Sequence, residues 1–205
     1  MLSNPSTFFN GLRTTKLFGA MLDQSEVDGL NAILSAAAGL DVQSTAYMLA
    51  TAYWETAHTM QPVKEANWLT PEQQARYFAR MYDPTGMRPD VARRLGNTQP
   101  GDGAKYCGRG YVQLTGRGNY AKADHDLGIA SIANPDVMLQ PGPAAQAMRR
   151  GMAEGWFTGR RLSDYFPRGG GYTQARRIIN GMDHASDIAD IAQVFETRLS
   201  MGGWR

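Results

Sequence analysis

Apolar residues recur along much of this chain at every third or fourth position, which is the spacing of amphipathic helices. Residues 25–37 show this spacing after a hydroxyl side chain and an acidic first turn, so we predict a helix there. Its apolar positions are Val27, Leu30 and Leu34. Asp41 then provides an N-cap for a segment that is apolar nearly all round over 46–54. This second segment predicts a helix that is buried on most of its faces.

The other helical patterns are bounded by capping and breaking residues. Thr70, Pro71 and Gln73 form the pattern of a capping box with proline at the first helical position, which predicts a helix over 71–81. Helical character returns in four later segments, 119–127, 143–157, 172–180 and 184–200. The last segment carries one apolar stripe, which predicts a core-facing side formed by Ile188, Ile191, Phe195 and Leu199 with Val194 beside it.

Residues 96–118, between these helices, are rich in glycine and poor in helix formers. They include a short alternation from Tyr111 to Thr115, and the segment as a whole is typical of turns around one or two short strands. The expected fold class is therefore mainly α with a small β element, in a single domain over 1–205. No repeat, low-complexity tract or long linker marks the boundary of a second module.

Composition and charge narrow the classes of function. The 205 residues are 42% hydrophobic and 20% charged, which is typical of a globular protein. The net charge of +2 is compatible with an anionic polymer as a partner, but it is too small to indicate nucleic acid. Cys107 is the only cysteine and the three histidines lack the paired spacing of zinc ligands, so we expect no disulfide, no metal and no cofactor. Neither a signal peptide nor an apolar stretch of membrane-spanning length is visible, so we expect no stable membrane association.

Two glutamates are candidates for acid–base chemistry. Glu55 directly follows two aromatic residues, and a carboxyl group held against aromatic surface loses hydration and keeps its proton near neutral pH, as a general acid must. Glu65 lies ten residues further on and would provide a second carboxylate. Solvated surface is the alternative for both side chains. Glu72 and Asp83 are alternatives to Glu65 as the second carboxylate.

The most specific signal is the run Gly-Arg-Gly-Tyr-Val-Gln-Leu-Thr-Gly-Arg-Gly-Asn-Tyr over residues 108–120. Together with Glu55-Thr56-Ala57-His58, the later Glu65 and the segment Arg-Arg-Ile-Ile-Asn-Gly over 176–181, it resembles the glycoside hydrolase family 19 chitinases and, more closely, the phage endolysins related to them. The resemblance extends over most of the chain. It implies a lysozyme-like fold in which two lobes flank a central glycan cleft.

The resemblance also implies roles for individual residues. Glu55 would be the general acid, Glu65 the general base, and the Thr115 hydroxyl would help to hold the attacking water, with inversion at the anomeric carbon. Contacts to the substrate or to the catalytic loop would come from His58, Tyr111, Gln113, Asn119, Arg177 and Asn180. Amides can donate and accept hydrogen bonds with sugar hydroxyls, and an aromatic face packs on a pyranose ring. The structural alternative is that the amides satisfy buried backbone groups and that Tyr111 belongs to the core.

Several departures from plant-type chitinases favour the endolysin branch. The chain is shorter, lacks their cysteine framework, carries Thr115 where they often have serine, and has a short interval between Glu55 and Glu65. Arg109 and Arg117 would steer wall anions or pair with Glu65, with solvated charge as the alternative.

An endolysin of this kind would hydrolyse the β-1,4 bond between N-acetylmuramic acid and N-acetylglucosamine in bacterial peptidoglycan. We expect a monomer without a wall-binding module or a nucleic-acid partner. It would be made in the host cytoplasm and reach the wall through a separate holin. The alternatives are a chitinase acting on N-acetylglucosamine polymers, a lytic transglycosylase, and a non-catalytic wall-binding protein of the same fold.

Overall fold

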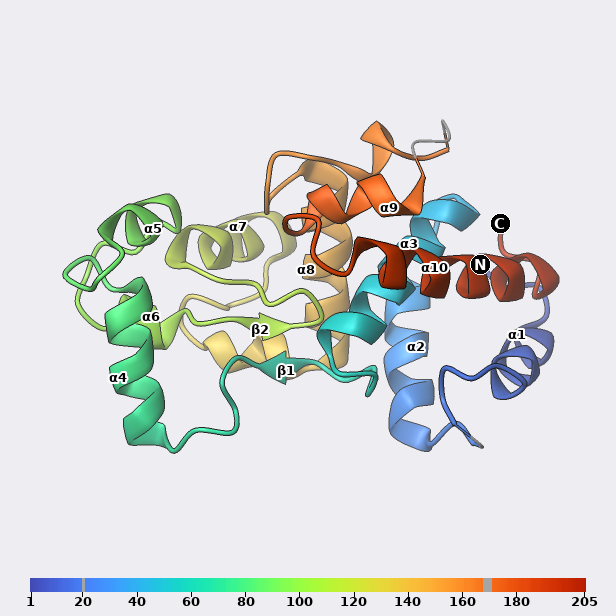
Figure 1. The fold of residues 1–205 in the computed structure, drawn as a ribbon, viewed down its shortest axis with the longest axis horizontal. Coiled ribbons are helices and arrows are strands. Elements are labelled where there is room, and N and C mark those ends of the chain that lie inside the picture. Colours follow the sequence, from blue (N-terminus) through green and yellow to red (C-terminus); the bar gives the residue numbers. More distant parts are fainter. Residues whose placement is uncertain (20, 168–170) are drawn as a thin grey trace. The chain divides into compact units, whose positions relative to one another are not determined.

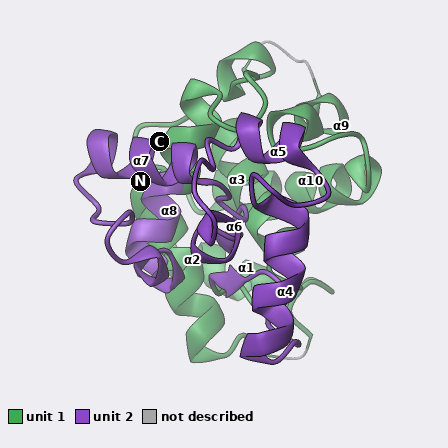
Figure 2. Ribbon diagram, turned by 90° about the vertical axis from the view of Figure 1, so that its left-hand side faces the viewer, with its two compact units in different colours: residues 1–61, 148–205 green, residues 62–147 purple. Residues whose placement is uncertain are grey.

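The computed structural model describes residues 1–19, 21–167 and 171–205 (Figure 1). The chain divides into two compact units, which Figure 2 distinguishes by colour. Unit 1 comprises residues 1–61 and 148–205, and unit 2 comprises residues 62–147. The boundary between 147 and 148 falls within helix α8, Pro141–Glu154. That the whole chain forms one catalytic domain stays a prediction.

Unit 1 is helical and is organised around the packing of α3 against α10. Its elements are α1 (Pro5–Arg13), α2 (Gln24–Ala36), α3 (Val42–Glu55), α9 (Tyr172–Ala175) and α10 (Ala185–Met201), with short 3₁₀ helices η2 (Leu162–Asp164) and η3 (Arg176–Ile178). Asp41 caps α3 by accepting the Ser44 N–H at 2.8 Å, and every residue from Ser44 to Tyr53 is buried. The predicted all-round burial of this helix is confirmed. It fixes the end of α3, where Glu55 lies, against the unit's core.

Unit 2 holds the short β element. Its elements are β1 (Val63–Lys64), α4 (Pro71–Tyr82), α5 (Pro89–Arg94), α6 (Asp102–Lys105), β2 (Arg109–Gly110), α7 (Arg117–Leu127) and the 3₁₀ helix η1 (Pro135–Leu139). β1 and β2 pair antiparallel, with Val63 opposite Gly110 and Lys64 opposite Arg109 (Figure 1). Thr70 and Gln73 form the predicted capping box of α4.

The fold class predicted from sequence, mainly α with a small β element, is confirmed. The helices expected over 25–37, 71–81, 119–127, 143–157 and 184–200 correspond to α2, α4, α7, α8 and α10 within a few residues. Ile188, Phe195 and Leu199 are buried as the stripe on α10 predicts, while Ile191 and Val194 are half-buried.

The turns and short strand expected within 96–118 are present, but the strand is β2, Arg109–Gly110, and Tyr111 to Thr115 form a turn. Gln113 has a φ of 53°, and the Leu114 N–H donates back to the Arg109 carbonyl at 2.8 Å. Alternation over five residues cannot distinguish such a turn from a strand. The single helix expected over 172–180 is wrong, since this segment holds only α9 followed by η3. The periodicity of the sequence did not predict α1, α5, α6 or β1.

The two arginines of the glycine-rich run support the backbone of unit 2. Arg109 is buried, pairs with Asp136 at 2.8 Å and donates to the carbonyls of Lys105 and Cys107. Arg117 donates two hydrogen bonds to the Asp102 carboxylate, at 2.9 and 2.6 Å. The expected pairing of either arginine with Glu65 is therefore wrong, because other acceptors occupy both guanidinium groups. Burial raises the pKa of Asp102, but the hydrogen bonds from Arg117 and from the Gln99 and Thr98 amides outweigh it and hold the pKa below its ordinary value of 3.8.

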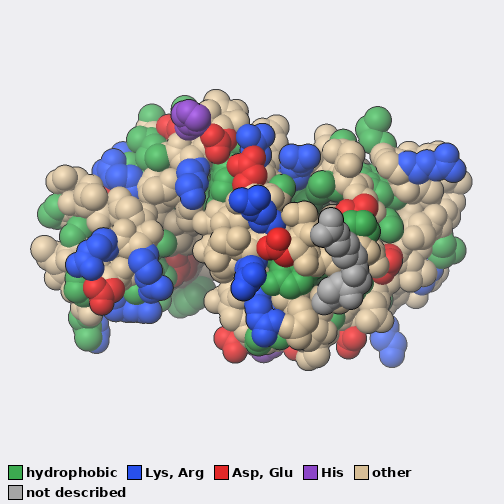
Figure 3. Space-filling model, turned by 90° about the horizontal axis from the view of Figure 1, so that it is seen from above, with side chains coloured by type: hydrophobic (Ala, Val, Ile, Leu, Met, Phe, Trp, Pro, Cys, Tyr) green, Lys and Arg blue, Asp and Glu red, His purple; other side chains and the backbone are tan. Residues whose placement is uncertain are grey.

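Charged side chains of both signs lie intermingled on the face drawn in Figure 3, as expected for a small net charge. Among the described residues, no helix is both long and apolar enough to cross a membrane.

We predict that Asp102→Asn lowers the free energy of unfolding by about 2 kcal/mol, because it removes the charge from a buried acceptor of several hydrogen bonds. A lowered folded-state pKa contributes stability above the unfolded-state pKa, and this contribution is lost as the pH falls through the folded-state value. Thermal unfolding followed by circular dichroism should therefore show a smaller difference between wild type and variant below pH 3.8 than at pH 7.

The matched control is Asp90→Asn, which removes an exposed ion pair with Arg93 and should change the free energy by less than about 0.5 kcal/mol. Equal destabilisation by the two substitutions would contradict the structural role of Asp102.

Candidate functional site

Three oxygen-bearing side chains of unit 2 meet at the position where Gly108 has no side chain. A Cβ atom placed there would lie 2.8 Å from Gln113 Oε1, 3.0 Å from Glu65 Oε2 and 3.2 Å from Thr115 Oγ1. Glu65 comes from an earlier segment of the chain, whereas Gln113 and Thr115 are neighbours in one turn, and all three are half-buried. We call Glu65, Gln113 and Thr115 the oxygen cluster.

The short sheet and the turn after it position the oxygen cluster. Glu65 directly follows β1, and its backbone N–H donates to the Gly108 carbonyl at 2.8 Å, while the Gly108 N–H donates to Glu65 Oε2 at 3.1 Å. Gln113 Nε2 donates to the carbonyls of Val63 and Gly110 at 3.1 and 3.3 Å. These bonds consume the amide's donors and leave Oε1 toward Gly108.

The oxygen cluster therefore presents acceptors. The Thr115 hydroxyl donates to the backbone carbonyl of Gln113 at 2.7 Å, so its lone pairs remain free to accept. Together with the side-chain Oε1 of Gln113 and the Glu65 carboxylate, it can orient a group that carries two hydrogens, such as a water molecule or an amide. This is the chemistry that a general base needs around the molecule it deprotonates.

Tyr82, at the end of α4, bonds the Glu65 carboxylate at Oε1, the oxygen that Gly108 does not contact. Its hydroxyl donates to Glu65 Oε1 at 2.8 Å. Burial raises the pKa of Tyr82, and the neighbouring charge of Glu65 raises it further, so the phenol stays protonated and remains a donor. Two neutral donors, this hydroxyl and the Gly108 N–H, thus hold the two oxygens of the Glu65 side chain.

The other two acidic residues considered from sequence lie in different surroundings. Glu72 is exposed in the first turn of α4 and accepts from the Thr70 hydroxyl at 2.9 Å. Asp83 is buried and accepts the N–H groups of Gly101 and Gly103 at 2.9 and 2.6 Å. Asp83 is thus occupied by backbone donors, and neither residue belongs to the oxygen cluster.

Glu55 ends α3 in unit 1 and forms an ion pair with Arg176. The Arg176 Nη1 lies 2.5 Å from Glu55 Oε1, and the two side chains are 5% and 20% exposed. Arg176 Nε also donates to the Asp183 carbonyl at 3.1 Å, which fixes the guanidinium in η3. The main polar neighbour of Glu55 is therefore the cation of Arg176. The sequence predicted aromatic surface as the main neighbour of this carboxyl group, and the ion pair corrects that prediction.

The aromatic residues before Glu55 pack on histidines. Tyr53 stacks on His58, with ring centroids 4.3 Å apart, and Trp54 lies 4.8 Å from the ring of His184. His58 is exposed in the turn after α3 and has a φ of 73°. Stacking on Tyr53 thus supports the turn that follows Glu55, and the role of His58 in ordering a catalytic loop stays a prediction.

The remaining residues expected to bind substrate fall into two groups. Tyr111 is 0% exposed, so it belongs to the core, which was the structural alternative to binding substrate. Burial raises the pKa of its phenol. Asn119 Nδ2 donates to the Thr115 carbonyl at 3.0 Å and so supports the turn that carries Thr115. Arg177 and Asn180 are exposed, next to the buried Arg176.

Sequence reasoning missed the roles of Tyr82, Gly108 and Arg176. Tyr82 is 17 residues from Glu65 and no spacing rule connects them. Arg176 lies in a segment that the sequence singles out, but nothing in the sequence distinguishes it from Arg177 as the buried partner. No cluster of metal-ligating residues occurs in the described part of the chain.

The fold has counterparts among solved structures, although no family model and no curated protein match the chain in sequence. Chitinase C from Streptomyces griseus HUT6037 superposes with a TM-score of 0.61 at 21% identity, over 97% of this chain and 78% of that one. A bacterial family 19 chitinase gives 0.62 at 22% identity, over 97% and 96%. A class IV chitinase of family GH19 from Zea mays gives 0.51 at 18% identity, over 96% and 90%. At these identities the likeness shows the fold, which is that of family 19 chitinases.

We predict that Arg176→Gln lowers the free energy of unfolding by about 3 kcal/mol, because it leaves a half-buried carboxylate without its cationic partner. The neighbouring Arg177→Gln is the matched control, since Arg177 is exposed, and should change stability by less than about 0.5 kcal/mol. Urea unfolding of the two variants measures both values. Similar losses in the two would show that burial of the Glu55–Arg176 pair contributes little.

Proposed function

We propose that this protein is a glycoside hydrolase that cleaves the β-1,4 bond between N-acetylmuramic acid and N-acetylglucosamine in bacterial peptidoglycan. One observation carries the proposal: the oxygen cluster places a carboxylate, a hydroxyl and an amide oxygen around one point, in a fold shared with family 19 chitinases. A carboxylate with acceptors beside it suits the activation of water.

In the proposed reaction, Glu65 accepts a proton from a water molecule that Thr115 and Gln113 orient. The water oxygen bonds to the anomeric carbon as the glycosidic bond breaks, and Glu55 gives a proton to the leaving oxygen. The ion pair with Arg176 is a resting contact of Glu55, which must take up a proton and release Arg176 before it can act as the acid. A single displacement of this kind inverts the anomeric carbon.

Peptidoglycan, rather than chitin, is proposed because of the features that favour the endolysin branch: the short interval from Glu55 to Glu65, the single cysteine and Thr115. In this role the enzyme acts as a monomer on glycan strands and is released from the host cytoplasm through a separate holin. Exposed Arg177 and Asn180, with His58, are the proposed contacts to the strand. Tyr111 and Asn119 would act through the turn that carries Thr115.

Glu55→Gln and Glu65→Gln should each abolish release of soluble fragments from purified peptidoglycan, with a loss of at least about 100-fold in rate. Each substitution preserves the shape of the side chain and removes its ability to exchange a proton. Turbidity of a wall suspension measures the rate, and circular dichroism checks that the fold is retained.

Glu72→Gln is the matched control in the same unit, because Glu72 is an exposed glutamate outside the oxygen cluster. It should retain wild-type activity. Activity that survives in Glu65→Gln but disappears in Glu72→Gln would transfer the role of base to Glu72.

Purified peptidoglycan should be degraded faster than N-acetylglucosamine oligomers under the same conditions. The released fragments should carry one added water by mass spectrometry, whereas a lytic transglycosylase leaves a 1,6-anhydro sugar without added water. Faster cleavage of chitin oligomers would instead make the enzyme a chitinase, as the names of its structural counterparts suggest. If the protein binds cell walls but cleaves neither peptidoglycan nor chitin oligomers, it is a non-catalytic wall-binding protein.

A further inference from the structure

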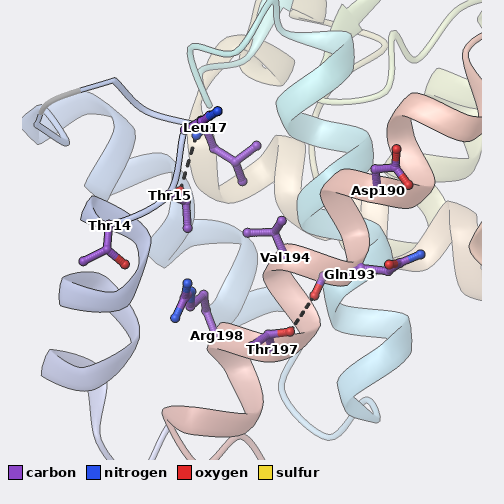
Figure 4. Close-up of a pocket in the computed structure, with 9 residues that line it drawn as sticks. Thr14, Thr15, Leu17, Asp190, Gln193, Val194, Thr197 and Arg198 are labelled. Carbon is purple, nitrogen blue, oxygen red and sulfur yellow. Dashed lines mark hydrogen bonds between the residues drawn. The ribbon is translucent and has the colours of Figure 1, made fainter.

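Unit 1 contains a groove of about 600 Å³ between the segment after α1 and one face of α10 (Figure 4). None of the residues considered for catalysis lines it. The lining residues are Thr14, Thr15, Lys16 and Leu17 from the segment after α1, and Asp190, Gln193, Val194, Thr197 and Arg198 from α10. We call this the α1–α10 groove.

The residues from α10 form one continuous stripe, because they are spaced three and four apart along the helix. Asp190 lies at one end of the stripe and Arg198 at the other, eight residues later, with Gln193, Val194 and Thr197 between them (Figure 4). Eight residues of α-helix rise about 12 Å. The groove therefore has an anionic end and a cationic end separated by about the length of three to four extended residues.

Arg198 has unused hydrogen-bonding capacity. Its buried Nε has no hydrogen-bond partner among the described residues, and its Nη1 donates to the sulfur of Met201 at 3.5 Å. Gly11 of α1 makes room for the side chain, since a Cβ there would lie 3.0 Å from Arg198 Cδ. A guanidinium with free N–H groups is suited to a carboxylate, which it can bind with two parallel hydrogen bonds.

The other side of the groove is held in place by hydrogen bonds. The hydroxyls of Thr14 and Thr15 donate to the carbonyls of Gly11 and Leu12 at 2.8 and 2.7 Å, and the Thr15 hydroxyl accepts the Leu17 N–H at 3.3 Å (Figure 4). The Leu17 carbonyl accepts the Tyr53 hydroxyl, and Phe18 packs edge-on against Tyr53 at 5.3 Å. The groove wall is thus fixed in advance, which lowers the entropic cost of binding.

We propose that the α1–α10 groove binds a short peptide that carries a free carboxylate and a free amino group. The carboxylate would lie at Arg198, with Lys16 adding a second positive charge to the lining, and the ammonium group would lie at Asp190. Leu17 and Val194 offer apolar contact for methyl side chains. In peptidoglycan, the stem peptides have this chemistry, and naming them as the ligand rests on the proposed function.

The probe is the tripeptide L-alanyl-γ-D-glutamyl-meso-diaminopimelic acid, titrated into the full-length protein labelled with nitrogen-15. We expect amide shifts over residues 14–17 and 190–198, and a dissociation constant that rises about ten-fold in Arg198→Gln through loss of a charge-assisted bidentate contact. Asp190→Asn should weaken binding of the tripeptide, but it should leave unchanged the weaker binding of the tripeptide that is acetylated on both of its amino groups.

Arg13→Gln is the matched control, because Arg13 lies on α1 outside the groove and bonds to Asn10. Lys16→Gln provides a second test at an exposed residue, where loss of folding is not expected. The proposal is overturned if the tripeptide causes no shifts in these segments, if N,N′,N″-triacetylchitotriose binds there more tightly, or if Arg198→Gln and Arg13→Gln bind the tripeptide equally well. Because the tripeptide has no glycosidic bond, these results are independent of whether Glu55 and Glu65 cleave glycans.

Discussion

The missing side chain at Gly108 is the constraint on which the arrangement of unit 2 depends. Glu65, Gln113 and Thr115 approach the point where a Cβ would lie, and any larger residue would separate them. The backbone of Gly108 also bonds Glu65 in both directions, so the same residue provides the space and fixes the carboxylate within it. The two-residue strands β1 and β2 matter mainly because their pairing brings the 63–65 segment to Gly108. A very small sheet is enough to define the geometry of this cluster.

The two candidate glutamates, one in each unit, have hydrogen-bond partners of different kinds. In unit 2, Glu65 is held by neutral donors, whereas Arg109 and Arg117 are directed away from it to Asp136 and Asp102. In unit 1, Glu55 is held by the cation of Arg176. Breaking an ion pair of low exposure costs more than breaking one in water, so Arg176 restrains Glu55 until another group competes for the carboxylate.

The sequence predicts most of the helices because caps and apolar periodicity are local signals. Asp41 and Thr70 begin their helices as expected, and the stripe through Ile188, Phe195 and Leu199 faces the core. The alternation over 111–115 is a turn because Gln113 takes a left-handed backbone conformation, and its side chain bonds the carbonyl of Val63, a long-range contact that no window of five residues contains. For the same reason the sequence singles out Glu65 and Thr115 through a resemblance, but it cannot reveal that Tyr82 donates to Glu65.

The groups around a carboxylate, rather than the position of the residue in the chain, decide whether it suits the role of acid or of base. A base must remain ionised and must have a water molecule beside it, so it needs donors that hold the carboxylate and acceptors that hold the water. Glu65 has both kinds, because Tyr82 and Gly108 donate to it while Thr115 and Gln113 keep free acceptor oxygens. Glu72 and Asp83 have their own donors but lack acceptors of this kind among the contacts described here. If Glu65 is the base, the acid must come from another carboxyl group. For Glu55 to fill that role it has to take up a proton and release Arg176, because the ion pair between them favours the ionised carboxylate.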